Sequence, residues 1–146
     1  MHRRSIAMLF AAGALLTSLA AAPAAYATQR FTTSLLGANE VPVSGDPDAS
    51  GTATITINRG LSEVCWQISV AGLTLPATAA HIHEAPSGSP GPIVVPLSAP
   101  DATGSASGCT TVSRALVKDI AKNPAEYYVN VHNADFPAGA MRGQLG

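Results

Sequence analysis

Short runs in which apolar and polar residues alternate are the clearest pattern in this chain. In residues 52–58 (TATITIN), Ala53, Ile55 and Ile57 alternate with polar residues, and residues 63–70 repeat the pattern around the single tryptophan. Successive side chains of a strand point to opposite faces, so a period of two predicts half-buried β-strands. The same signals predict further strands over residues 31–36, 78–83, 93–97, 108–112, 127–132 and 141–145.

The segments between these runs are rich in glycine, proline, serine and aspartate. Residues 39–50 (NEVPVSGDPDAS) contain prolines that exclude them from the centre of a sheet, and residues 98–107 are also turn-rich. Residues 58–60 (Asn-Arg-Gly) join two predicted strands. They suit a tight hairpin in which Gly60 takes a positive φ.

One segment follows a helical period instead. Residues 114–122 (RALVKDIAK) carry apolar residues at i, i+1 and i+4, namely Leu116, Val117 and Ile120. Ser113 suits the N-cap, and Asn123 followed by Pro124 ends the helix. About eight strands, one short helix and no β-α-β alternation predict an all-β antiparallel sandwich or barrel.

The first 27 residues have the features of a secretory signal peptide. Arg3 and Arg4 precede an apolar run over residues 6–22, and Ala25 and Ala27 flank Tyr26 in the small-x-small pattern of a cleavage site. The alternative is a membrane anchor, but the run is marginal in length for spanning a bilayer. We expect cleavage after Ala27, leaving residues 28–146 as one domain that works outside the cytoplasm, secreted or at the exterior of the cell envelope.

Charge and cysteine content fit such a domain. The whole chain has 8 basic and 9 acidic residues, and loss of Arg3 and Arg4 leaves six basic against nine acidic, a net charge of −3. No basic cluster remains that would favour nucleic acid or an anionic membrane, so the expected partner is an extracellular protein or a cell-wall ligand. Cys65 and Cys109 form an even pair, which predicts one disulfide, with two free buried thiols as the alternative.

Three histidines are the main chemical signal in residues 28–146. His81 and His83 are two apart on a predicted strand, so both imidazoles lie on one face, and His132 ends another strand. Three imidazoles suffice to hold copper or zinc, with Glu84 or Asp135 orienting a ring through its second nitrogen. The alternative is a hydrogen-bonded structural network without metal.

No other chemistry has comparable support in the sequence. No serine lies in a nucleophile motif. The segment GSPGP does not suit a phosphate-binding loop, because it has prolines where backbone N–H donors would be needed. We therefore predict no catalytic residues.

Three segments resemble the chordin-type (CHRD) domain family: FTTSLLGANEVPV, SVAGLTLPATAAHIHEAPSGSPGPIVVPL and YYVNVHNADFPAGAMRGQL. They occur in the family's order and cover nearly all of residues 30–145. The resemblance implies an immunoglobulin-like β-sandwich, found in animal antagonists of growth factors and in lone exported bacterial proteins without an assigned activity. Two positions depart from the family pattern: Met141 replaces an acidic residue, and Glu84 replaces a glycine.

The histidine motifs also resemble the copper half of copper/zinc superoxide dismutases. His81, His83 and His132 match its H-x-H and V-H ligands, and Arg142 corresponds to its anion-guiding arginine, but the zinc-ligand loop is missing. The sequence thus favours a non-catalytic binding or structural module with no certain cofactor. The alternative is a three-histidine copper protein with redox or superoxide-related activity.

Overall fold

The computed structural model describes residues 28–146; the predicted signal peptide, residues 1–27, lies outside the described residues. The described chain forms eight strands: β1 (Thr28–Leu36), β2 (Ser50–Asn58), β3 (Glu63–Ala71), β4 (Ala79–Glu84), β5 (Ile93–Leu97), β6 (Ser105–Thr111), β7 (Tyr127–His132) and β8 (Met141–Gln144). It also contains one α-helix, α1 (Arg114–Lys122), and two short 3-10 turns, η1 (Gly37–Asn39) and η2 (Pro124–Glu126). None of the helices in this part of the chain is long and apolar enough to cross a membrane.

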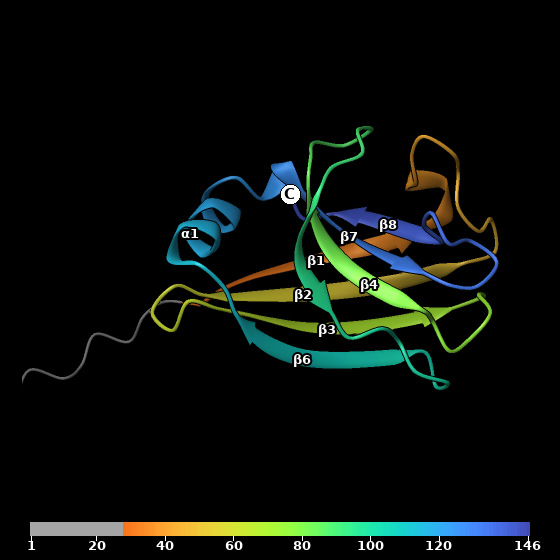
Figure 1. Cartoon of the computed structure of the whole chain (residues 1–146), viewed down its shortest axis with the longest axis horizontal. Coiled ribbons are helices and arrows are strands. Elements are labelled where there is room, and N and C mark those ends of the chain that lie inside the picture. Colours follow the sequence, from red (N-terminus) through yellow and green to blue (C-terminus); the bar gives the residue numbers. More distant parts are fainter. Residues whose placement is uncertain (1–27) are drawn as a thin grey trace, which may run out of the picture.

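All eight strands belong to one antiparallel sheet with the order β5-β4-β7-β8-β1-β2-β3-β6. The sheet folds over on itself as a nearly closed barrel or sandwich, with β4, β7 and β8 in one layer and β1, β2 and β3 in the other (Figure 1). Strands β5 and β6 are its two edges. The all-β class with one short helix is confirmed.

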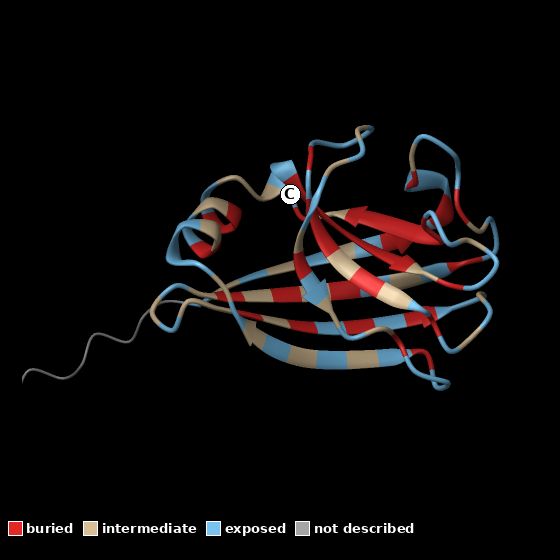
Figure 2. Cartoon of the chain, viewed as in Figure 1, coloured by how far each residue is buried: buried red, intermediate tan, exposed pale blue. Residues whose placement is uncertain are grey.

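The core lies between the two layers and follows the alternation of each strand. Buried residues alternate with intermediate or exposed ones along most of β2 and β3, which appear as banded ribbons in Figure 2. The largest fully buried aliphatic residues are Leu35, Ile55, Ile57, Val64, Ile82, Val95, Val117, Ile120, Val129, Val131 and Met141. Each such side chain contributes about 1.5–3 kcal/mol when it leaves water, so these rows hold the two layers together.

Trp66 fills the barrel next to the edge strand β6. Its pairing partner on that strand is Gly108, and a Cβ atom added there would lie 2.5 Å from Cζ2 of the indole. The close approach of the ring therefore requires glycine at position 108. Strand β6 begins at Ser105, three residues before the predicted start, because pairing with β3 makes a strand from residues of turn-rich composition.

The helix has the predicted bounds and N-cap. Oγ of Ser113 accepts a hydrogen bond from the backbone N–H of Leu116, and Val117, Ile120 and Ala121 face the core. The hairpin between β2 and β3 differs from the prediction. The positive φ falls on Ser62 (54°) and not on Gly60, because the Asn58 side chain accepts bonds from the N–H groups of residues 60 and 61.

A disulfide joins Cys65 of β3 to Cys109 of β6, which confirms the predicted pairing. The two residues are direct partners in the register, and their Cα atoms are 4.0 Å apart. The bond ties an edge strand to its only neighbour across 44 positions of sequence.

Removal of this cross-link in a Cys65→Ser/Cys109→Ser variant should lower the free energy of unfolding by about 2–4 kcal/mol, because the unfolded chain regains loop entropy. Urea unfolding under oxidising conditions measures the loss. A thiol reductant should weaken the wild type and leave the double variant unchanged; an unchanged wild type would contradict a stabilising role.

Candidate metal centre

The outer face of β4, β7 and β8 is polar, although most of it is covered. Its register places His81 opposite Asn130 and His83 opposite Tyr128, and Asn130 in turn lies opposite Arg142. Residues 127–131 of β7 are all buried, with the barrel core on one side and polar neighbours and loops on the other. This face therefore holds polar side chains away from bulk water, where their hydrogen bonds are strong.

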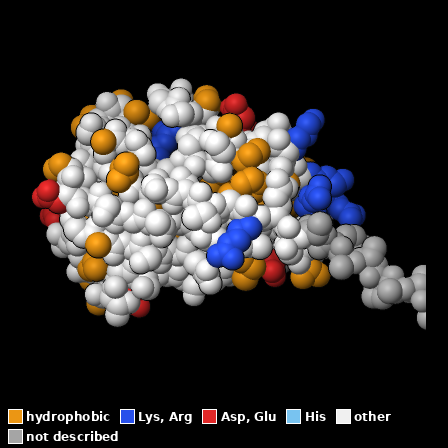
Figure 3. Space-filling view, turned by 180° about the vertical axis from the view of Figure 1, so that it is seen from behind, with side chains coloured by type: hydrophobic (Ala, Val, Ile, Leu, Met, Phe, Trp, Pro, Cys, Tyr) orange, Lys and Arg blue, Asp and Glu red, His pale blue; other side chains and the backbone are white. Residues whose placement is uncertain are grey.

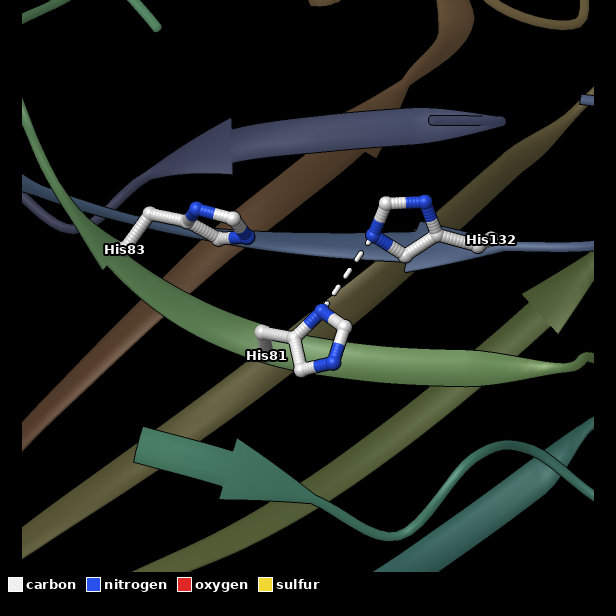
Figure 4. A group of neighbouring side chains, drawn as sticks. All are labelled: His81, His83 and His132. Atoms are coloured by element: carbon white, nitrogen blue, oxygen red, sulfur yellow. Dashed lines mark hydrogen bonds between the residues drawn. The ribbon is translucent and has the colours of Figure 1, made fainter. Parts of the chain in front are cut away.

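Three histidines meet on this face. His81 and His83 share one side of β4, and His132 lies on β7 opposite Ala79, next to His81 along the sheet (Figure 4). Nδ1 of His81 is 3.3 Å from Nε2 of His132. One ring nitrogen from each of the three histidines lies within 4.8 Å of the other two. The structure thus brings together the three predicted ligands.

Backbone carbonyls orient two of the rings. Nδ1 of His83 donates to the carbonyl of Gly91 (2.8 Å), and Nδ1 of His132 lies 3.0 Å from the carbonyl of Pro137. Because a carbonyl only accepts, a neutral His83 ring then carries its hydrogen on Nδ1 and its lone pair on Nε2. Nε2 of His83 is thereby left as the acceptor, the form that a metal ligand requires. Nε2 of His132 also lies 3.1 Å from Oδ1 of Asn130, a second acceptor, so its two contacts do not fix which of its nitrogens carries the hydrogen.

Glycine at position 91 allows the first of these contacts. A Cβ atom at Gly91 would lie 2.0 Å from the carbonyl oxygen of Glu84, so a larger residue cannot sit this close to β4. The same backbone N–H donates to the hydroxyl of Tyr128 (3.2 Å). Both backbone polar groups of Gly91 are therefore hydrogen-bonded, the carbonyl to His83 and the N–H to Tyr128.

Nε2 of His83 is the unsatisfied atom of the cluster. His83 is only 9% exposed, and this nitrogen is buried without a hydrogen-bond partner among residues 28–146. A buried lone pair without a partner is destabilising unless a donor or a cation meets it. Figure 4 shows this end of the ring pointing towards His81 and His132, so a cation held between the three histidines would satisfy it.

Electrostatics keep the other two rings neutral. Burial lowers the pKa of His81, and the neighbouring His132 and His83 lower it further. Burial also lowers the pKa of His132, although the carbonyl of Pro137 opposes this. Neutral imidazoles are the species that bind metal, so the cluster is prepared for a cation.

The spacing fits a small tetrahedral ion. Two nitrogens each about 2.0–2.1 Å from zinc, at a tetrahedral angle, are separated by about 3.3–3.4 Å. The observed separation between His81 and His132 is 3.3 Å. The two sides that involve His83 are within 4.8 Å, so His83 would move by at most about 1.5 Å to reach the same ion.

Arg142 lies on β8, where it pairs with Asn130 of β7. It is 2% exposed, and its guanidinium donates to the carbonyls of Ser89 (2.8 Å) and Pro86 (3.0 Å) and to Gln144. The predicted anion-guiding role needs an exposed guanidinium, and this placement does not provide one. The burial results from the loop after β4, whose carbonyls cover Arg142.

The same arginine takes part in a stack that supports His83. Its Cζ lies 3.4 Å from the centre of the Tyr128 ring, and His83 stacks on that ring at 4.8 Å with an interplanar angle of 7°. Two groups at these distances cannot share one side of a ring, so Tyr128 is held between them. Cation–π attraction and stacking thereby position the His83 imidazole.

Neither acidic residue that the sequence offered contacts an imidazole. Glu84 is exposed and, by strand alternation, points to the opposite face of β4 from His81 and His83. Asp135 accepts a hydrogen bond from Oγ1 of Thr74 at 2.5 Å. The carbonyls of Gly91 and Pro137 take the orienting place that these carboxylates were predicted to fill.

Glu40 is the residue that sequence reasoning missed. It follows η1 in a segment predicted to be a polar loop, yet it is 6% exposed. Burial raises the pKa of its carboxyl to about 7, against the opposing effects of Arg142 and of a hydrogen bond with Asn130. Asn130 also lies 3.1 Å from Nε2 of His132, so Glu40 belongs to the same polar network. Nothing in the local sequence marks this acid as buried.

Comparison with protein families identifies the chain. The model of the CHRD domain matches residues 31–145, so the chain belongs to the CHRD domain family. No curated protein and no solved structure shows a significant match.

A Glu40→Gln variant should change how stability depends on pH. Folding raises the pKa of Glu40 from 4.5 to about 7, so the folded state favours the protonated acid. The contribution of this group to stability is complete below pH about 4.5 and declines as the pH rises towards 7. Glutamine resembles the protonated acid and does not ionise. The melting temperature of the variant, relative to that of the wild type, should therefore rise as the pH increases from 4.5 to 8. The exposed Glu84→Gln variant serves as control. If the melting-temperature difference between Glu40→Gln and the wild type were the same at every pH, the effect would be excluded.

Proposed function

We propose that this CHRD domain is an extracytoplasmic binding module that holds a transition-metal ion, copper or zinc, with His81, His83 and His132. The carrying observation is the buried Nε2 of His83, which has no hydrogen-bond partner within residues 28–146 and points towards the other two imidazoles (Figure 4). Backbone carbonyls hold two of the three rings in place through Nδ1. Because the rings already have defined orientations, binding an ion costs less ordering of the ligands than in a flexible site.

Binding is favoured over redox catalysis. Three nitrogen ligands leave a position open for water, which is compatible with either role. However, the arginine that would attract an anion is buried and bonded to carbonyls. The domain therefore suits capture, storage or a structural use of the ion better than turnover of superoxide.

Location outside the cytoplasm is part of the proposal. The Cys65–Cys109 disulfide is consistent with an extracellular protein, because such bonds persist in oxidising compartments. The signal-like features of residues 1–27 support the same location. A site outside the cytoplasm also meets copper more readily than one inside.

Calorimetric titration of the metal-free protein with Cu(II) and with Zn(II) tests the site. His83→Ala and His132→Ala should each bind about 100-fold more weakly than the wild type or worse, since each loses one of three ligands. Glu84→Gln, an exposed change on the other face of β4, should bind as the wild type does. Equal affinity in His83→Ala and wild type would refute the metal site.

The hydrogen-bonded alternative has a different signature. If the cluster is only structural, His83→Ala lowers the melting temperature equally with and without metal. If it holds an ion, added metal raises the melting temperature of the wild type and leaves the variant unchanged.

Export predicts a defined mature end. When the full chain is expressed in a secreting host, N-terminal sequencing of the purified protein should begin at Thr28 (TQRFTT). A chain that retains Met1 and stays in the cytoplasm would overturn the proposed location and leave the metal site to be judged separately.

A further inference from the structure

The outer face of the other half of the sheet carries a regular array of short polar side chains. Antiparallel register aligns the outward residues of β1, β2, β3 and β6 into four rows of four, here called the hydroxyl face. The rows are Thr28, Asn58, Glu63 and Thr111; Arg30, Thr56, Cys65 and Cys109; Thr32, Thr54, Gln67 and Ser107; Ser34, Thr52, Ser69 and Ser105. None of the sixteen is buried.

The array is nearly free of charge. Twelve of its sixteen residues are serine, threonine, asparagine or glutamine, and only Arg30 and Glu63 are charged. Two charged residues in sixteen match the 12% of charged residues in the whole chain, so the face is set apart by its serine, threonine and amide side chains and not by its charge. Figure 3 shows the molecule from behind, where much of the surface is neither charged nor hydrophobic, although a basic side chain and a hydrophobic group lie near its middle.

The hydroxyl face is also shaped. A hollow of about 390 Å³ is lined by Arg30, Thr56, Gln67 and Ser107 together with the disulfide. A second hollow of about 520 Å³ shares Gln67 and Ser107 and continues towards Asp101 at the β6 edge. Within the array, the hydroxyls of Thr32 and Thr54 are 3.1 Å apart and hydrogen-bonded. The surface thus offers two joined depressions bordered by ordered hydrogen-bonding groups.

The chemistry of the face selects its partner. Nucleic acid needs a basic surface, a bilayer needs apolar residues, and the centres of protein interfaces are enriched in aromatic residues, methionine and arginine. Serine, threonine, asparagine and glutamine both donate and accept hydrogen bonds, which matches a neutral polymer rich in hydroxyl groups. Serine and threonine are also short, so holding them in place costs less entropy than fixing lysine or glutamate.

We propose that the hydroxyl face binds an uncharged polysaccharide. The polymer lies across β2, β3 and β6 along the joined hollows, and its hydroxyls exchange hydrogen bonds with Thr54, Gln67 and Ser107. This face belongs to the layer opposite β4 and β7 and shares no residue with the histidine cluster. Polysaccharide binding is therefore independent of the metal and of the function proposed above.

Sedimentation with insoluble polysaccharides tests the proposal. Purified protein is mixed with crystalline cellulose or chitin, both uncharged, and with alginate beads as the anionic comparison, all in excess chelator. The fraction removed from solution by cellulose or chitin should exceed that for alginate and should persist at high salt. His83→Ala should be retained as the wild type is, which separates this result from the metal site.

Two variants place the contact. Thr54→Glu and the near-isosteric Gln67→Glu each put a charge in the centre of the array and should lower retention at least about tenfold, because a charge that loses its water in the contact is unfavourable. Ser87→Glu, in the exposed loop after β4, is the matched control, and its retention on the polysaccharide should equal that of the wild type. Circular dichroism and melting temperature verify folding of each variant. Retention on neither uncharged polymer, or equal retention of Gln67→Glu and wild type, would overturn the proposal.

Discussion

The antiparallel pairing of β4 with β7 is the interaction on which the histidine cluster depends. It brings His81 next to His132, although about fifty positions separate them in the chain. A shift of β4 by one residue would turn both of its histidines into the barrel and Ile82 out towards the loops. The burial of Ile82 against the core therefore also sets the position of the histidines.

The same alternation produces three environments from one sheet. Inward positions form an apolar core, and outward positions of β4, β7 and β8 form a polar layer. Outward positions of β1, β2, β3 and β6 stay open to water. The polar layer is the unusual part, because burying polar groups is unfavourable without partners. The loop after β4 supplies many of them: its carbonyls accept hydrogen bonds from Arg142 and His83.

Much of the fold could be predicted from local patterns. The bounds of β5, α1 and β7 agree with the prediction because their periodicity and flanking residues are strong signals. The start of β6 and the hairpin after β2 were missed because each depends on a contact with another residue. Residues 105–107 take their conformation from pairing with β3, and the hairpin takes its from the Asn58 side chain, and composition reveals neither contact.

By itself, the sequence determined which residues face the core, that His81 and His83 share one face, and that two cysteines are available to pair. These follow from the two-residue period of a strand and from counting. Only the tertiary structure decided that Glu40 and Arg142 are buried and that Gly91 and Pro137, not Glu84 and Asp135, orient the imidazoles. The reason is physical: burial and hydrogen bonding depend on which loops cover a strand, and that is set by packing between residues far apart in the chain.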